Sequence, residues 1–345
     1  MPSVAQSVFA RMSRRFAASK TRDASSSQYV GLRCPVCTSD LASVTYDSLG
    51  HLPASIDCPQ CSFILTQQQG ILLALAKHRL AHFERFMCDY EKVRKAEGRG
   101  SLRSEFYLAL PDSDLTNRNS WQWAIRAKTY RYMERKLLPA ISLGTPRPLQ
   151  VLDLGAGNCW LSYRLAQIGH RPVAVDLQIN AFDGLAAAEH FRHALPSLFP
   201  RVQSEMDCLP FDTEQFDCVI FNASFHYSED YDRTLSEAIR CVRPGGSIII
   251  ADSPTYSCDA SGRRMLAERR KLFQTRYGFT SDSLASREYL TDERLLALQQ
   301  KHRLKWAAHR VWYGLGWACR PLIARVRRRR EPSQFLVYTA QVKSA

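Results

Sequence analysis

The sequence predicts an α/β fold in which a doubly wound, mostly parallel sheet follows a small metal-binding module and a helical connector. Three observations predict it. From Leu149 onward, apolar strand-like segments alternate with helical segments, which is typical of a parallel sheet with helices on both faces. A glycine-rich turn follows the first of these strands, at 150–154. Two closely spaced cysteine pairs precede the domain, and 345 residues suffice for one large domain and one small module.

Composition and spacing divide the chain into four segments. These are a basic tail at 1–30, a zinc-ribbon module at 31–70, a helical connector and linker at 71–148, and the α/β domain at 149–345. The acid-free tail is expected to be frayed, with an organelle transit peptide or a surface-binding helix as alternatives. The longest apolar stretches fall well short of the roughly 20 residues that a membrane-spanning helix needs.

The cysteines and the charged residues indicate in which cellular compartment the protein works and where its basic residues are concentrated. The chain has eleven cysteines, several of them in segments expected to be buried, which favours a reducing compartment. We therefore expect a cytoplasmic protein, with attachment to a membrane surface as an alternative. The net charge is +14, and ten Lys and Arg without any acid lie within 301–330. Much of the excess charge is therefore one local feature.

Four cysteines have the spacing of a metal site. Cys34 and Cys37 form one C-x2-C pair, and Cys58 and Cys61 form a second pair twenty residues later. Two such pairs are typical of a four-thiolate zinc ribbon, and a small module with few large apolar side chains needs the ion to fold. Because all four ligand positions are filled, the Zn2+ is predicted to be structural. A pair of disulfides is the alternative, and the reducing compartment disfavours it.

The α/β domain is expected to follow a regular order of elements. The expected strands are 150–154, 172–176, 202–205, 216–222 and 247–252, and the expected helices are 158–168, 180–193 and 228–242. Ser228 is expected to cap the last of these helices. The segments 304–311 and 334–342 are expected to form a closing strand pair, and the insertion at 254–300 is a candidate lid.

The turn from Asp153 to Asn158 favours one kind of nucleotide ligand. Trp160 occupies the position where a dinucleotide-binding fingerprint has its third glycine, and the Gly-Lys-Ser/Thr of a phosphate loop is absent. Asp153 would repel a pyrophosphate but attract a ligand with an ammonium and a sulfonium group. The loop therefore fits S-adenosylmethionine better than NAD. Asp176 ends the next strand, where it can accept both ribose hydroxyls, and Asp207 follows the third strand, near the expected adenine.

Together with 216–222 and 242–247, these segments resemble the class I S-adenosylmethionine-dependent methyltransferases, in particular their type 11 branch. The resemblance covers about 151–252. It implies a Rossmann-like methyltransferase sheet and S-adenosyl-L-methionine as the methyl donor. It also implies that the cofactor site contains the following residues: Asp153, Gly155, Ala156, Gly157, Asn158, Asp176, Leu177, Asp207, Cys208 and Asn222.

The residues after the fourth strand narrow the chemistry. The segment 222–227 lacks the Asn/Asp-Pro-Pro-aromatic sequence used on exocyclic or amide nitrogens and the Pro-Cys nucleophile of pyrimidine carbon-5 enzymes. His226 is the candidate catalytic base, because an imidazole can accept a proton near neutral pH. The alternative is a histidine that packs beside the cofactor or caps the following helix.

The acceptor is expected to be a small molecule or a lipid-like compound. A first alternative is an rRNA or tRNA methyltransferase that binds RNA through the zinc ribbon and the basic tail, because a ribbon before a methyltransferase domain resembles bacterial ribosomal-RNA guanine methyltransferases. The ribbon alone resembles the adaptor subunits of tRNA and protein methyltransferases, so a non-catalytic adaptor is a second alternative. The aromatic and basic segment 312–330 is expected to pack on the sheet edge, to contact a membrane surface or to bind RNA phosphates. The sequence does not indicate an oligomeric state.

Overall fold

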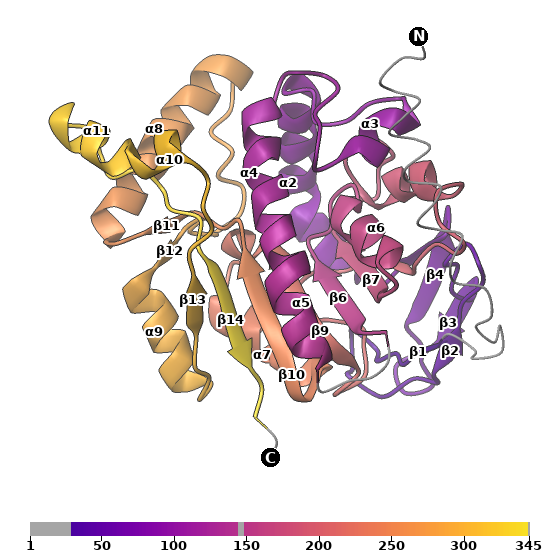
Figure 1. Ribbon diagram of the computed structural model, residues 1–345. Coiled ribbons are helices and arrows are strands. Elements are labelled where there is room, and N and C mark those ends of the chain that lie inside the picture. The colour runs from indigo at the N-terminus through magenta and orange to yellow at the C-terminus, as the bar shows by residue number, and fades with distance from the viewer. Residues whose placement is uncertain (1–28, 144–147, 344–345) are drawn as a thin grey trace, which may run out of the picture.

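A computed structural model describes residues 29–143 and 148–343 (Figure 1). Its main feature is one ten-stranded sheet. In spatial order the strands are β13 (Ala307–His309), β14 (Val337–Gln341), β10 (Val242–Ala251), β9 (Phe216–Asn222), β6 (Gln150–Leu154), β7 (Arg171–Asp176), β8 (Arg201–Gln203), β5 (Ile71–Leu73), β4 (Ile64–Gln68) and β3 (Ser55–Asp57). Residues 1–28 of the basic tail and most of the linker predicted before Leu149 lie outside the described residues.

The centre of the sheet is parallel and its two sides are antiparallel. Strands β10, β9, β6, β7, β8 and β5 run in the same direction. β14 and β13 form an antiparallel closing pair, as the sequence predicted, and β4 and β3 are antiparallel on the other side. The strand order reverses at β6, which lies between β7 and β9. Ligands bind outside the carboxyl ends of the strands at such a reversal.

Both faces of the sheet are buried, because successive side chains of a strand point to opposite faces. In β9, Cys218 and Ile220 belong to one apolar core, whereas Val219 and Phe221 belong to the other. The first face is covered by α4 (Ser120–Tyr132), η2 (Met133–Leu137), α5 (Leu138–Ser142) and α6 (Trp160–Gln167). The second face is covered by α7 (Tyr231–Cys241) and α9 (Asp292–Lys301). In Figure 1, α4, η2 and α5 form one long helical rod across the sheet.

The remaining elements surround the carboxyl ends of the strands or lie at the periphery. They are the helices α2 (Lys77–Ala96), α3 (Ser104–Ala109), η3 (Leu185–Phe191), η4 (Phe225–Tyr227), α8 (Asp259–Tyr277), α10 (Leu315–Ala318) and α11 (Arg320–Val326), and the small strand pairs of β1 (Tyr29–Val30) with β2 (Val44–Thr45) and of β11 (Thr255–Tyr256) with β12 (Leu290–Thr291). Figure 1 shows α8, α10 and α11 grouped on the side of α4 that faces away from α3.

Two local predictions were wrong. The expected helix at 180–193 is a turn followed by η3, because the Asn180 Oδ1 atom accepts hydrogen bonds from the backbone amides of Phe182 and Asp183 and forms a turn there instead. Asp230, and not Ser228, caps α7. Its carboxylate accepts hydrogen bonds from the backbone amides of Asp232 and Arg233. The Ser228 hydroxyl lies 2.7 Å from the Thr234 hydroxyl instead.

The cysteine-containing module is continuous with the main sheet. β5 pairs in parallel with β8, and β4 and β3 extend the sheet from there. Leu32, Leu65 and Leu72 belong to the same apolar core as Val219 of β9. Because these residues share one core, the first strands of the chain and the later α/β elements form a single folded unit within the described residues.

Among the described residues, none of the helices has both the length and the apolar character required to span a bilayer.

Candidate active site and metal centre

The loop after β6 is held close to two neighbouring strands. The amides of Gly155 and Ala156 both donate to the Val175 carbonyl, at 2.8 and 2.9 Å. Gly155 has a φ of +74°, and a Cβ atom added there would lie 2.2 Å from the Ser224 Cβ atom. Gly157 also has a positive φ, of +53°. Only glycine therefore fits at position 155 without displacing Ser224, which follows β9.

Asp176, at the carboxyl end of β7, is fixed against this loop. One carboxylate oxygen accepts from the Gly157 amide at 2.8 Å and the other accepts from the Gln178 amide at 2.8 Å. Burial raises the pKa of Asp176 to about 6, although these two hydrogen bonds favour the ionised form. The carboxylate has lone pairs left over, so it can still accept from a bound hydroxyl.

Three adjoining cavities lie at the carboxyl ends of the strands. The strand-end cavity, of about 90 Å³, is lined by Gly155, Asp176, Leu177, Asp207 and neighbouring side chains. The loop cavity, of about 40 Å³, is lined by residues of the loop after β6. The wide cavity measures about 410 Å³. Tyr90 and Ala223 line all three, so the cavities meet there.

The loop cavity contains unpaired oxygen atoms. One Asp153 oxygen accepts from the Ser162 hydroxyl at 2.7 Å, but its Oδ1 atom is buried without a hydrogen-bond partner among the described residues. The Asn222 Oδ1 atom is also buried and without a partner there. Burial raises the pKa of Asp153 to about 7. Buried acceptors without partners are costly, so these two atoms fit a cationic group such as an ammonium.

Basic side chains face the same cavity. Arg94 pairs with Asp183, to which the Asn158 side chain also donates, at 3.3 Å. Arg126, from α4, lines both the loop cavity and the wide cavity and has no ion pair among the described residues. Ala156 contributes to the lining as well. A ligand with an ammonium and a carboxylate therefore finds both complementary charges here.

The lining of the strand-end cavity has the chemistry that a nucleoside needs. Phe83 and Leu284 supply apolar walls, while Asp176 and Asp207 supply carboxylates. The Asp207 carboxylate accepts from the Thr234 hydroxyl, and burial raises its pKa to about 6. Cys208 does not line this cavity, because its thiol donates to the Pro35 carbonyl at 3.1 Å.

Sequence comparison agrees with this geometry. Residues 152–250 match the family described as "Methyltransferase domain". They include β7, β8 and β9 and most of β6 and β10, which are the strands whose carboxyl ends surround the cavities. This segment is a class I S-adenosylmethionine-dependent methyltransferase domain.

Three curated relatives of the methyltransferase domain are similar over part of the chain. A malonyl-[acyl-carrier protein] O-methyltransferase of Methylococcus capsulatus is 28% identical over 168 residues, which are 48% of this chain and 58% of the relative. A demethylmenaquinone methyltransferase of Mycobacterium marinum is 30% identical, over 36% of this chain and 49% of the relative. A phthiotriol/phenolphthiotriol dimycocerosates methyltransferase of Mycobacterium leprae is 35% identical, over 43% of this chain and 56% of the relative. The chain thus spans about half the length of the curated relatives that it matches.

Two solved structures are similar to the methyltransferase domain at low identity. YcgJ protein from Bacillus subtilis gives a TM-score of 0.45 at 14% identity, covering 61% of this chain and 98% of that one. An S-adenosylmethionine-dependent methyltransferase from Mesorhizobium loti gives a TM-score of 0.39 at 20% identity, covering 59% of this chain and 96% of that one. Neither structure informs on the acceptor.

His226, the candidate catalytic base predicted from the sequence, lines the wide cavity. Its Nδ1 atom is 3.2 Å from the Ser253 hydroxyl. Burial, together with the charges of Arg269 and Arg126, lowers the pKa of His226 to about 3. An imidazole with this pKa is neutral at pH 7 and is a weak proton acceptor.

Sequence reasoning did not identify the contribution of the connector to the cavities. Phe83, Phe86 and Tyr90 of α2 line the strand-end cavity, and Arg126 of α4 borders the loop cavity. The first three have the spacing of one helical face. That spacing indicates a buried helical face, but it does not indicate which ligand the face covers.

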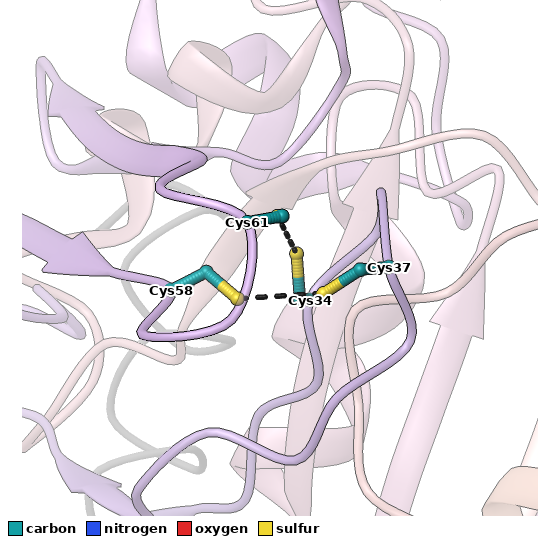
Figure 2. A group of neighbouring side chains, drawn as sticks. All are labelled: Cys34, Cys37, Cys58 and Cys61. Atoms are coloured by element: carbon teal, nitrogen blue, oxygen red, sulfur yellow. Dashed lines mark hydrogen bonds between the residues drawn. The ribbon is translucent and has the colours of Figure 1, made fainter.

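The four cysteines of the two pairs come together at one point. Their sulfur atoms all lie within 4.8 Å of one another, with 3.6 Å between Cys34 and Cys61 and 3.5 Å between Cys37 and Cys58. Figure 2 shows the side chains facing each other from two loops. Four sulfurs at about 2.3 Å from a tetrahedral Zn2+ would have similar separations. The donor set and its geometry therefore fit a structural zinc ion.

Proposed function

We propose that the whole protein transfers the methyl group of S-adenosylmethionine to a small-molecule or lipid-like acceptor in the wide cavity. One observation carries this proposal: Tyr90 and Ala223 line the two cavities that fit the cofactor and also the wide cavity. A donor and an acceptor bound on either side of this junction would be in contact. Methyl transfer needs such positioning more than any other contribution.

Within this proposal, each cofactor group has a partner in the chain. Asp176 accepts from the ribose hydroxyls and Asp207 borders the adenine. Asp153 and Asn222 accept from the ammonium through the oxygens that otherwise have no partner. Arg126 pairs with the carboxylate. The bound cofactor supplies an electrophilic methyl group, while these side chains orient it toward Ala223.

The wide cavity suits an acceptor with an apolar body. Its lining is rich in aromatic side chains, namely Phe86, Tyr90, Trp121, Tyr227, Phe273, Trp317 and Phe335. Its volume of about 410 Å³ is in the range of small-molecule sites. The names of the three relatives give malonyl-[acyl-carrier protein], demethylmenaquinone and phthiotriol derivatives as their acceptors. We infer a small-molecule or lipid-like acceptor here as well.

The proposed function extends to peripheral contact with an anionic membrane through 312–330. Large apolar side chains are exposed on this segment, namely Trp312, Leu315, Leu322, Ile323 and Val326. Arg325 and Arg327–Arg329 are exposed on the same segment. Exposed apolar groups beside arginines are typical of helices that lie in the headgroup region. Trp317 and Arg320 of this segment line the wide cavity, so a lipid-like acceptor would have a short path into it.

Co-sedimentation with phosphatidylglycerol-containing vesicles tests the membrane contact. Wild type should sediment, and Leu322→Asp with Val326→Asp should not. Binding to RNA without binding to vesicles would contradict the membrane contact and favour the RNA-binding alternative.

Methyl transfer is tested with isotope-labelled S-adenosylmethionine and a total lipid extract of the expression host. We expect labelled product in the lipid fraction, together with release of S-adenosylhomocysteine. Tight binding of S-adenosylhomocysteine without any methyl transfer would contradict the proposed enzymatic activity and favour a non-catalytic adaptor.

We further propose that Zn2+ occupies the four-cysteine site as a structural ion. Native mass spectrometry should find one zinc per chain. Cys58→Ser should lose it, whereas Cys88→Ser, at an exposed cysteine outside the cluster, should keep it.

A further inference from the structure

Asp252 has an unusual position in the wall of the wide cavity and, unlike the other buried acid there, Glu288, which pairs with Arg269, it has no ion pair among the described residues. It follows β10 directly, has a φ of +50° and is 6% exposed. Its Oδ1 atom accepts from the Thr129 hydroxyl at 2.7 Å, but its Oδ2 atom is buried without a hydrogen-bond partner among the described residues. A positive φ outside glycine is costly and clusters at functional sites. An unpartnered carboxylate oxygen in a cavity wall requires a ligand or a proton to satisfy it.

The oxygen that is bonded is held firmly. Thr129 lies 2.8 Å from the Tyr313 hydroxyl, whose single proton can be donated either to the Thr129 oxygen or to the Phe335 carbonyl at 3.1 Å. Thr129 and Tyr313 are both buried, so this chain of hydrogen bonds is shielded from water. It fixes one oxygen of the carboxylate and leaves the other without a hydrogen-bond partner among the described residues. A base oriented by a third group in this way is a recurring arrangement in catalysis.

Asp252 is also close to the junction of the cavities. The Ala223 amide donates to the Ala251 carbonyl at 2.9 Å, and Ala251 pairs with Asn222 across β10 and β9. Asp252 and Ala223 are thus the next residues along two adjacent strands. Because Ala223 borders all three cavities, Asp252 lines the wide cavity near the expected position of the methyl group.

The charges of the wide cavity indicate what kind of acceptor atom it would hold. Arg94, Arg99 and Arg269 are paired with Asp183, Glu97 and Glu288, respectively. Two more cavity arginines, Arg126 and Arg320, have no ion pair among the described residues. Arg126 also faces the expected cofactor carboxylate, so Arg320 is the cavity arginine left to balance the Asp252 carboxylate. The described lining of the wide cavity thus has no surplus carboxylate to hold an ammonium acceptor, and its arginines favour a hydroxyl that is losing its proton.

We propose that Asp252 is a catalytic residue, the general base that removes the proton from a hydroxyl-bearing acceptor. The inference rests on the proposed function. An electron pair of the acceptor oxygen forms the new bond to the methyl carbon, and the electrons of the broken carbon–sulfur bond remain on sulfur. The hydroxyl proton passes to the Asp252 Oδ2 atom and then to solvent. The products are a methyl ether and S-adenosylhomocysteine.

The electrostatic surroundings suit this role. Burial raises the pKa of Asp252, while Arg126 and the Thr129 hydroxyl, both from α4, act in the opposite direction. The other titratable neighbour that acts on it is Tyr313, and His226 lines the same cavity. A carboxyl with a raised pKa accepts a proton more readily than an ordinary aspartate. Because the ionised form is the base, the rate should rise as the pH rises through this pKa.

The decisive variant is Asp252→Asn, because its amide oxygen can still accept from Thr129 and should preserve the fold. The assay uses S-adenosylmethionine with a 13C-labelled methyl group and the total lipid extract of the expression host. We expect a 13C signal typical of a methyl group on oxygen with wild type. Asp252→Asn should lose a hundredfold or more in kcat, with unchanged affinity for S-adenosylhomocysteine. Thr129→Val should lose about tenfold and shift the pH profile, because the carboxylate is no longer fixed.

Asp292→Asn, at an exposed aspartate that lines none of the three cavities, is the matched control and should keep wild-type activity, whereas His226→Gln should lose less than tenfold. Product formation by wild type with less than a tenfold loss in Asp252→Asn would overturn the role of Asp252. A methyl group on nitrogen would overturn the hydroxyl acceptor. If wild type forms no labelled product at all, the proposed function itself fails, which is a different result from either of these.

Discussion

The cofactor side and the acceptor side of the site are built in different ways. The cofactor side consists largely of strand ends and loops from one continuous stretch, 152–250. The acceptor side combines helices α2, α4 and α8 with the segment that contains α10, and these come from widely separated parts of the chain. The first is a local motif and the second is a product of the whole fold. The difference predicts that substitutions on each side should have separable effects.

Asp176→Ala should have the largest effect on the cofactor side. It removes a charged acceptor for two ribose hydroxyls and the partner of the Gly157 amide. Each charged hydrogen bond contributes about 1.5–3 kcal/mol, so we expect affinity for S-adenosylhomocysteine to fall about a thousandfold. Isothermal titration measures this, with Glu84→Ala, an exposed acid on α2, as the control. Unchanged affinity would remove Asp176 from the cofactor site.

Gly155→Ala should have the next largest effect. Its new Cβ atom would clash with Ser224, which costs about 1–3 kcal/mol, in addition to the strain of a positive φ. Gly169→Ala has similar strain, since its φ is +89°, but its Cβ atom would meet nothing within 4 Å. We expect Gly155→Ala to bind S-adenosylhomocysteine about a hundredfold more weakly and Gly169→Ala to bind it normally. Equal affinities would mean that backbone strain, and not the clash, governs this loop.

Trp121→Ala should affect the acceptor side alone. The indole lines the wide cavity next to Trp317, at 5.7 Å between ring centres, and touches neither cofactor cavity. Its loss should raise the KM for the lipid acceptor about tenfold without changing kcat or the affinity for S-adenosylhomocysteine. Leu102→Ala, at a 95% exposed position away from the cavities, should change none of these. A weaker affinity for the cofactor would contradict the separation of the two sides.

The pH dependence of cofactor affinity should be an equally small effect. Burial raises the pKa of Asp153 to about 7, and only its ionised form attracts the ammonium of the ligand. Affinity is therefore lost as the pH falls through this pKa, and it should change about tenfold between pH 6 and pH 8. Asp176, with a pKa of about 6, adds to the loss at the lower end. Titrations of Asp153→Asn should show a flatter profile, and a wild-type profile that is flat as well would contradict this assignment.

The same contrast explains what the sequence could predict. The turn at Asp153–Asn158 and the two cysteine pairs are local, and the spacing of their residues follows directly from strand, turn and ligand geometry. The strand ends at Asp176 and Asn222 could be found because both follow clear apolar runs.

Other features depend on contacts between distant segments. The pairing of β5 with β8 joins residues 71–73 to 201–203, and nothing in either stretch specifies its partner. The hydrogen bonds around Asp252 link α4 to the loop before α10 in the same way. The position of His226 after β9 can be read from the sequence, but its lowered pKa depends on burial and on Arg269 and Arg126, which only the folded chain brings near.

The ten-stranded sheet has short borders. Among the described residues, its outermost strands are β3 and β13, and each is three residues long. A long free edge is a template for pairing with another chain, so short borders protect a large sheet against aggregation. Within the described residues, the borders of this sheet therefore offer little backbone for pairing with a second copy.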